Sequence, residues 1–378
     1  MSYKICVIGD GITALILSKV FLNLNIETYL LNNNISKRVK NAHRTVGISE
    51  SNFQYLENHK IIDKKNNKPW KINEIKIFNT KLKGKKNLIF NFNTKEKKTL
   101  FYMFKNDLFF SKLKNNIKKN SKLKFLKKND IKNILDNNKN YNNFDLIINC
   151  SSFNEVSKKF FFKKIKKNYK SIALVTIIKH KKILNHTASQ YFTKYGPIAF
   201  LPLSEEKTSV IWSLKLKNLK NKYLSNIQKI KKDIKNISSG MFKNISFSKI
   251  NKFDLNFSIP REYYKNNILI FGDASHQIHP LAGQGLNMTI RDIKVLENII
   301  KKNISLGLEL NENLLLDFVK KTKAYNFFFA KGNDFIENYF SINNKLFNFY
   351  SEKLLKRMNK NTTIKELIIK IADKGLNY

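Results

Sequence analysis

Residues 272–287 decide the fold: Gly-Asp-Ala-Ser-His-Gln-Ile-His-Pro-Leu-Ala-Gly-Gln-Gly-Leu-Asn. The stretch follows the apolar run 268–271, which predicts a buried strand, and it leads into a helical pattern that extends to about residue 301. Such a strand delivers Asp273 to the carboxyl edge of a sheet, where a carboxylate can accept hydrogen bonds from a polyol. Gly283 and Gly285 would let the backbone pack against a flat ring at the start of the helix, whose N-terminus favours negative charge.

Another glycine-rich turn stands near the start of the chain. The apolar run 3–8 meets residues 9–14, Gly-Asp-Gly-Ile-Thr-Ala, which fit the dinucleotide fingerprint G-x-G-x-x-G/A between a strand and a helix. Gly9 would make the tight turn, Gly11 would leave room for a pyrophosphate, and Ala14 would permit close packing of the helix on the strand. The anion would then lie at the helix N-terminus. A plain glycine turn is the alternative, because this short fingerprint is weak evidence alone.

The end of the second strand departs from that fingerprint. The run Glu27–Leu31 predicts the strand, and Asn32 follows where a carboxylate usually holds a ribose. An amide can accept a hydrogen bond, but a neutral acceptor makes a weaker one. We expect Asn32 to contact the cofactor weakly.

The remaining patterns predict two interleaved units and a helical end. Apolar runs between residues 73 and 105 predict β-hairpins, 107–118 predicts a helix, and Phe144–Cys150 predicts a buried parallel strand. Mostly extended segments between about 170 and 260, interrupted by a Lys-rich helix near 221–236, predict a separate antiparallel layer. The fold class is therefore α/β: a Rossmann-like domain interwoven with an antiparallel β-sheet domain, followed by a helical C-terminus.

The formal net charge of +43 comes almost entirely from lysine spread along the chain with Asn and Ile. Arginine, which suits bidentate contacts with phosphate and guanine, occurs only at Arg38, Arg44, Arg261, Arg291 and Arg357. We therefore predict no nucleic-acid partner and attribute the lysines to compositional drift, with a selected basic surface as the alternative. Such a surface would favour anionic membranes by about 1 kcal/mol per well-placed lysine.

The cysteines, histidines and apolar runs indicate the redox compartment and bear on metal binding and membrane spans. Cys6 and Cys150 each lie in an apolar strand-like run, which predicts reduced thiols in a reducing compartment. His276 and His279 are three residues apart without a suitable third ligand, so we predict no metal site. The chain reads directly into a strand and has no apolar run approaching the roughly 20 residues that span a bilayer. We expect a cytoplasmic protein, with room for peripheral contact at the inner face of a membrane.

Residues 272–287, continued by Arg291-Asp292, resemble the second FAD motif of the class A flavoprotein hydroxylases, in which Gly-Asp is followed by a proline and a G-x-G-x-N segment. The resemblance implies FAD as the cofactor. Asp273, preceded by Gly272, would bind the ribityl chain. The residues implied to line the isoalloxazine ring are Pro280, Gly283, Gly285, Leu286 and Asn287.

Other segments resemble the ubiquinone-biosynthesis hydroxylases within that class. Residues 196–203 and 210–213 look like part of their substrate layer, Arg44 matches their FAD-contacting arginine, and Asn106 matches a polar position before the next helix. The resemblance implies a monooxygenase that uses O2 to hydroxylate the ring of a polyprenylated phenol. NAD(P)H is the candidate reductant, and other quinone-biosynthesis proteins are candidate partners. No motif assigns a catalytic residue.

The resemblance also implies a division of the chain. We expect a discontinuous FAD-binding domain from residues 1–72, 101–165 and 262–305, a substrate domain from residues 73–100 and 166–261, and a C-terminal helical region from residues 306–378.

One segment departs from the family. Cys150-Ser151-Ser152 stands where the family has Asp-Gly after the strand, a motif associated with FAD and with the nicotinamide reductant. The change removes a carboxylate, and serine restricts the backbone more than glycine does. Together with Asn32 it favours an alternative, a non-catalytic scaffold or accessory member of a quinone-biosynthesis complex. The intact second motif favours the enzyme, because a scaffold has no need of ring-packing glycines.

Overall fold

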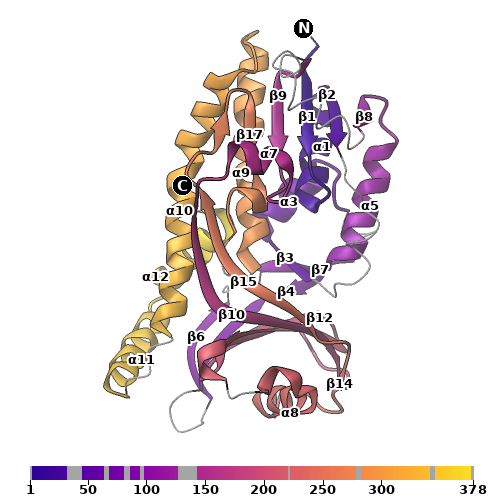
Figure 1. The fold of residues 1–378 in the computed structure, drawn as a ribbon. Helices are drawn as coiled ribbons and strands as arrows, with labels where there is room; N and C mark the ends of the chain where they lie inside the picture. The colour runs from indigo at the N-terminus through magenta and orange to yellow at the C-terminus, as the bar shows by residue number, and fades with distance from the viewer. Residues whose placement is uncertain are drawn as a thin grey trace.

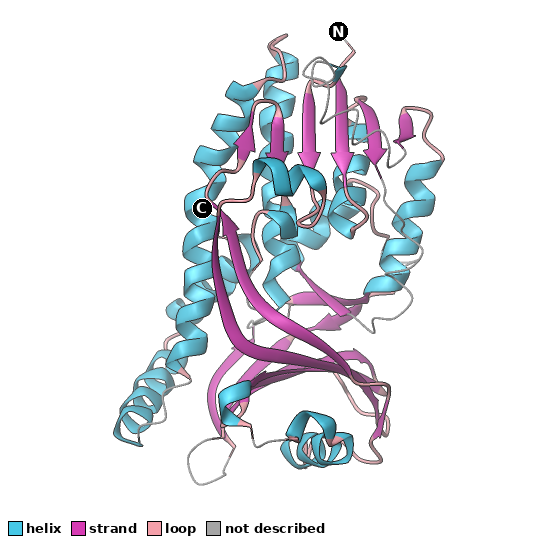
Figure 2. Ribbon diagram, viewed as in Figure 1, coloured by secondary structure: helices cyan, strands magenta, loops and turns pink. Residues whose placement is uncertain are grey.

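The computed structural model describes residues 2–31, 45–63, 68–80, 86–93, 98–126, 143–219, 222–277, 283–340 and 345–375. Two large sheets stand at opposite ends of the molecule, with a small sheet between them and long helices along one side (Figures 1 and 2). This arrangement confirms the predicted class, in which a parallel sheet with helices is interwoven with a second β layer.

The first sheet has the strand order β16-β17-β9-β1-β2-β8. Its strands are β1 (Lys4–Ile8), β2 (Glu27–Leu31), β8 (Leu123–Leu126), β9 (Leu146–Asn149), β16 (Tyr264–Lys265) and β17 (Ile268–Ile270). All neighbours pair in parallel except β16 with β17. Segments from the beginning, the middle and the later part of the chain therefore form one sheet.

Helices and a β-ribbon cover the two faces of this sheet. They include α1 (Ile12–Asn23), α3 (Glu50–Asn58), α5 (Asn106–Lys118), α7 (Glu155–Phe160), the short η5 (Gly272–Ala274) and α9 (Gln284–Ser305). Val7 and Ile148 belong to the core that includes α1, α3, α5 and α9, whereas their neighbours Cys6 and Ile147 pack on the opposite side with Val156 of α7. This alternation follows from the two-residue period of a strand.

Helices α3 and α9 are joined by a buried carboxylate, Glu297. Its Oε2 accepts a hydrogen bond from the Tyr55 hydroxyl (2.6 Å) and lies 3.1 Å from His59 Nε2, and its Oε1 lies 2.6 Å from Lys301 Nζ. Burial alone would raise the pKa of Glu297, but the hydrogen bonds from His59, Lys301 and Tyr55 outweigh it and hold the pKa at about 2.

We expect Glu297→Gln to lower the free energy of unfolding at neutral pH by about 1–3 kcal/mol, the usual effect of breaking a buried charged hydrogen-bond set. Because the folded-state pKa lies below the ordinary 4.5, this stabilisation is present above 4.5 and is lost as the pH falls towards 2. Urea unfolding at pH 7 and pH 3 measures the difference between wild type and variant, which should shrink at pH 3. Glu309→Gln, which alters an exposed carboxylate, is the control. An equal difference at both pH values would contradict the prediction.

The second sheet has the order β14-β10-β13-β12-β11-β5-β6, and β15 pairs with β10. Its strands are β5 (Glu74–Asn79), β6 (Asn87–Asn93), β10 (Lys164–Lys179), β11 (Thr187–Thr193), β12 (Gly196–Ser204), β13 (Lys207–Lys215), β14 (Ser246–Phe247) and β15 (Asn251–Pro260). The expectation of a purely antiparallel layer is corrected at one junction, because β11 pairs with β5 in parallel. Helix α8 (Ile227–Ile237), with the short η3 (Leu216–Asn218) and η4 (Tyr223–Ser225) nearby, packs on the face that carries Trp212.

Two strand predictions need correction. The run near residues 100–104 is not part of a hairpin with residues 88–92: it forms β7 (Phe101–Lys105), which pairs with β3 (Thr45–Ser49) and β4 (Trp70–Ile72) in a separate three-stranded sheet. Strand β10 begins at Lys164, well before the expected residue 172. The prediction missed its first half because that half is rich in exposed lysine and shows no apolar pattern. There it pairs with β15 as a twisted ribbon reaching the first sheet (Figure 1).

The C-terminal part is helical, as expected, with α10 (Glu312–Tyr339), α11 (Lys345–Lys360) and α12 (Thr362–Lys374). Helix α11 and part of α12 pack on β6, and the end of α12 is held to the start of α3, where the Asp373 carboxylate accepts a hydrogen bond from Ser51 N (2.9 Å). Within the described residues, no helix is both long enough and apolar enough to cross a bilayer. The division into domains stays a prediction.

Candidate cofactor site

The first glycine turn joins β1 to α1. Gly9 N donates to Leu31 O (3.0 Å), and a Cβ at Gly9 would lie 3.1 Å from the Cβ of Cys150, so this turn packs tightly against the end of β9. Helix α1 starts at the cap residue Gly11 with no side-chain cap and no acidic residue in its first turn. Its first N–H groups are thus left without a side-chain acceptor, and the space that a Cβ of Gly11 would enter is open to 4 Å.

The second glycine turn lies directly against the first. Gly272 adopts φ +62, and a Cβ there would come within 2.8 Å of Thr13 Cγ2 in α1. Asp273 follows as an exposed residue at the carboxyl edge of the sheet. A backbone hydrogen bond from Phe271 N to Asn149 O (2.9 Å) aligns this turn with the end of β9. The structure therefore brings Gly9 and Gly11 together with Gly272 and Asp273, more than 250 residues further along the sequence.

The start of α9 is a second uncapped helix end. Its cap residue, Gly283, has φ +62 and no side-chain cap, and the space beside both Gly283 and Gly285 is open to 4 Å. Within the same turn, the Gln284 Oε1 atom is buried and has no hydrogen-bond partner among the described residues. Two open helix N-termini and an orphaned polar atom fit a long ligand with a phosphate group and a polar planar ring.

Two predicted residues of this helix have roles inside the protein. Asn287 donates from Nδ2 to Gly47 O (2.9 Å) and accepts from Ser49 N through Oδ1 (2.9 Å), while Asn52 Nδ2 bonds its carbonyl (3.2 Å). The Asn287 side chain thus anchors the start of α9 to β3 and α3, and contact between its backbone and the ring stays a prediction. Leu286 packs against the main core, and Ala14 is buried within that core.

A buried chain of polar side chains supports the segment that follows the Gly-Asp turn, and sequence reasoning did not identify this chain. His276 Nε2 lies 3.1 Å from Asp292 Oδ2, and Asn326 of α10 donates to both oxygens of Asp292 (3.0 and 2.9 Å). All three side chains are buried. The chain of bonds links the end of the Gly-Asp motif to α9 and α10. Spacing along the sequence carries no signal for Asn326, because it lies on a different helix.

Several predicted contacts lie outside the described residues. These are Asn32, Arg44, Pro280 and the side chain of Asn106, whose backbone begins α5. Their roles at the cofactor stay predictions.

The segment that replaces Asp-Gly folds without a glycine. Ser152 is not among the non-glycine residues that adopt a positive φ in the described part of the chain, and its hydroxyl donates to Asp273 O (3.3 Å). Burial, and in second place the Asp273 carboxylate, raises the pKa of the neighbouring Cys150 thiol. The raised pKa keeps Cys150 in the neutral thiol form, and Ser152 ties this loop to the Gly-Asp turn.

One face of the second sheet is turned towards β3. The Thr45 hydroxyl of β3 donates to the Ser209 hydroxyl of β13 (2.9 Å). Since side chains alternate along a strand and paired residues share a face, Val175, Ile211 and Ala199, which pair in a row across β10, β13 and β12, lie on the same face as Ser209. This row is uncharged and apolar.

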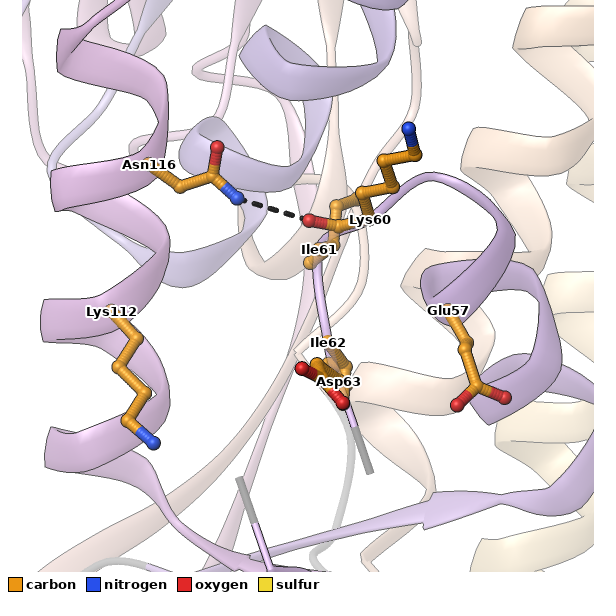
Figure 3. A pocket seen from close by; sticks show the side chains of 7 residues that line it. All are labelled: Glu57, Lys60, Ile61, Ile62, Asp63, Lys112 and Asn116. Atoms are coloured by element: carbon orange, nitrogen blue, oxygen red, sulfur yellow. Dashed lines mark hydrogen bonds between the residues drawn. The ribbon is translucent and has the colours of Figure 1, made fainter. Parts of the chain in front are cut away.

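A pocket elsewhere does not contain the predicted residues. It lies between α3 and α5 and is lined by Glu57, Lys60, Ile61, Ile62, Asp63, Lys112 and Asn116 (Figure 3). Asn116 Nδ2 donates to Lys60 O (3.0 Å), which joins the segment after α3 to α5. No glycine turn borders this pocket, and a cofactor at the carboxyl edge of the first sheet stays a prediction. Among the described residues there is no cluster of three or more potential metal ligands.

Comparisons with known proteins identify a family and several relatives that resemble this chain. Residues 141–305 match the family described as FAD binding domain, a range that contains the second glycine turn but not the first. The ubiquinone biosynthesis monooxygenase COQ6 of Dictyostelium discoideum is 26% identical over 218 residues, which cover 49% of this chain and 44% of the relative. The 3-demethoxyubiquinol 3-hydroxylase of Escherichia coli (strain K12) is 29% identical over 158 residues, 41% of this chain and 40% of the relative. The chain thus spans about half the length, or less, of these curated relatives.

Among solved structures, p-nitrophenol 4-monooxygenase PnpA from Pseudomonas putida DLL-E4 superposes with a TM-score of 0.75 at 10% identity, covering 100% of this chain and 99% of that one. PqsL of Pseudomonas aeruginosa, in complex with 2-aminobenzoylacetate, has a TM-score of 0.70 at 11% identity over 90% of this chain and 97% of that one. At such identity these likenesses concern the fold alone. Residues 141–305 match an FAD binding domain, which supports FAD as the cofactor, and the chain shares the fold of these solved structures.

Proposed function

We propose that this protein is a monooxygenase that hydroxylates the aromatic ring of a polyprenylated phenol in ubiquinone biosynthesis. One observation carries the proposal: the open glycine N-terminus of α9 is anchored through Asn287 to β3, the strand whose Thr45 meets the apolar face of the second sheet. A ring held at α9 and a phenol held on that sheet face would therefore approach each other across β3. The names of the sequence relatives support a quinone precursor as the substrate class.

The chain's own residues would bind and orient both partners. The N–H groups at the start of α1 would hold the pyrophosphate, Asp273 would accept hydrogen bonds from the ribityl hydroxyls, and the N-terminus of α9 would favour negative charge at the ring. When bound, FAD supplies the electron transfer and oxygen activation that side chains cannot perform. In the overall reaction one oxygen atom of O2 enters the ring, the other leaves as water, and NAD(P)H supplies two electrons.

The row Val175, Ile211 and Ala199 would shape the substrate side. These apolar side chains would bury the phenol ring and exclude water from the reacting centre. None of them can transfer a proton, so the catalytic residue stays unassigned. Contact with other proteins of quinone biosynthesis stays a prediction.

The visible absorption spectrum of the purified protein tests the proposal first. With added FAD, we expect a bound flavin that bleaches when NADPH is added without oxygen and that hydroxylates a polyprenylated phenol when oxygen is returned. A flavin that stays oxidised with NADPH but yields product after photochemical reduction would support the monooxygenase with an external electron donor. Absence of bound flavin, or of product from the reduced protein, would contradict the proposal.

Ile211→Arg is the matched variant for the substrate side. A guanidinium on this apolar row should abolish hydroxylation, because an unpaired charge beside the ring would have to be desolvated. FAD binding should be unchanged, since Ile211 stands in the second sheet and the glycine turns follow strands of the first. Product formation at the wild-type rate would place the substrate elsewhere.

A further inference from the structure

Helix α10 carries an exposed face on which aromatic and lysine side chains alternate. Phe328 and Phe335 are 65% and 67% exposed, and Phe327 is 38% exposed. Ala324, Phe328, Lys331 and Phe335 follow one another at steps of four, three and four residues, which places them on one side of a helix. We call Lys320, Lys323, Phe327, Phe328, Lys331 and Phe335 the aromatic–lysine face.

The opposite side of α10 accounts for its packing, so this face is not needed for the core. Leu315 and Phe318 are buried in the main core, and Ala330 is buried against the other side of the first sheet. Asn326 holds the Asp292 carboxylate. Contiguous exposed phenylalanines on a helix already satisfied by its buried side indicate a surface that meets an apolar partner.

The charge on this face is mainly positive, and the exposed Asp317 at its start is paired with Lys321 (2.9 Å). Lys320, Lys323 and Lys331 are exposed, and Lys331 lies over the Phe327 ring with its Nζ 5.6 Å from the ring centroid. Asp334, the carboxylate of α10 between residues 318 and 336, is buried and bonded to Tyr169 and Lys167. Lysines that flank aromatic rings can extend their ammonium groups to polar headgroups while the rings enter the apolar layer.

The adjoining start of β10 continues the surface. Phe162 and Ile165 are 62% and 46% exposed beside Lys163. Lys163 O accepts a hydrogen bond from Arg261 N (2.9 Å), and Arg261 O accepts one from Lys323 Nζ (3.1 Å), so this segment lies next to α10. Figure 1 shows α10 along the outer edge of the molecule, with this end of β10 beside it.

We propose that the aromatic–lysine face of α10, with the start of β10, binds an anionic phospholipid surface. The lysines complement anionic headgroups, and the exposed phenylalanine rings can enter the apolar layer beneath them. The inference goes beyond the proposed hydroxylation and does not depend on it, because lipid binding is measured without substrate or reductant.

Sedimentation with vesicles tests the inference on the full chain loaded with FAD. We expect binding to vesicles of phosphatidylcholine with phosphatidylglycerol, and at least tenfold weaker binding to phosphatidylcholine alone. Phe328→Ser with Phe335→Ser should weaken binding to anionic vesicles at least tenfold. Lys320→Gln, Lys323→Gln and Lys331→Gln together should weaken it by roughly 100-fold, because each lysine near an anionic surface contributes about 1 kcal/mol.

Leu184→Ser is the matched control, because Leu184 is 90% exposed in the loop between β10 and β11 and should not affect vesicle binding. Unchanged FAD affinity and thermal unfolding would show that the variants fold. Failure of the wild type to bind anionic vesicles, or equal binding by the phenylalanine variant, would overturn the inference. A self-association that the phenylalanine variant abolishes, without any vesicle binding, would assign the face to a second copy of this chain and would overturn it as well.

Discussion

Gly11→Val should weaken FAD binding at least 100-fold while leaving the free energy of unfolding of the FAD-free protein almost unchanged. Gly11 adopts φ −95 and ψ 174, an extended conformation that valine accepts, and the structure leaves 4 Å of open space where its side chain would stand. The added methyl groups would occupy the space that the pyrophosphate needs to approach the start of α1. Losing two hydrogen bonds to a charged group costs about 3–6 kcal/mol, which corresponds to a roughly 100-fold to 10,000-fold loss of affinity.

Flavin fluorescence titration measures the affinity, and urea unfolding of FAD-free protein measures the stability. Gly332→Val is the control, since it adds the same group at another glycine with open space around it, on α10 away from the glycine turns. Its FAD affinity should equal that of the wild type. If Gly11→Val bound FAD normally, the cofactor would not use the first glycine turn. If it unfolded easily without FAD, the glycine would serve the fold and not the ligand.

Gly196→Ala should destabilise the protein by more than about 4 kcal/mol, at the extreme of single substitutions. Gly196 begins β12 with φ +130, and a Cβ there would lie 2.0 Å from Ser213 O on the neighbouring strand. The obstacle is backbone in the middle of a sheet and cannot rotate away. Relief would require separating β12 from β13, which carry the face assigned to the substrate.

Gly240→Ala separates the two possible causes. Gly240 also has a positive φ, +80, but a Cβ there would meet nothing within 4 Å. The variant should lose only about 1–2 kcal/mol, the cost of a left-handed backbone for an L-residue. Thermal and urea unfolding of both variants give the comparison. Equal losses would mean that backbone strain, and not the contact with Ser213 O, limits position 196.

Sequence patterns predicted the positions of the glycine turns because the requirements there are local. A strand must end, a helix must begin, and glycine is needed where the backbone approaches a ligand or a neighbour, so Gly9, Gly272 and Gly283 could be recognised from short spacings. Spacing could not predict that Gly272 would lie against Thr13, since that contact depends on β17 and β1 flanking the same central strand, β9. For the same reason spacing could not predict that the side-chain amide of Asn287 bonds the backbone of β3.

By itself, the sequence determined the class of fold, the strands β1, β2, β9 and β17 of the first sheet and the two helix starts open to a ligand, because period, turn chemistry and glycine spacing act within a few residues. Only the tertiary structure decided which distant segments meet. It formed the parallel junction of β11 with β5, the small sheet that receives β7, the buried chain from His276 through Asp292 to Asn326, and the outward direction of Phe328 and Phe335. These features depend on which apolar faces are buried against each other, and burial is a property of the packed chain as a whole.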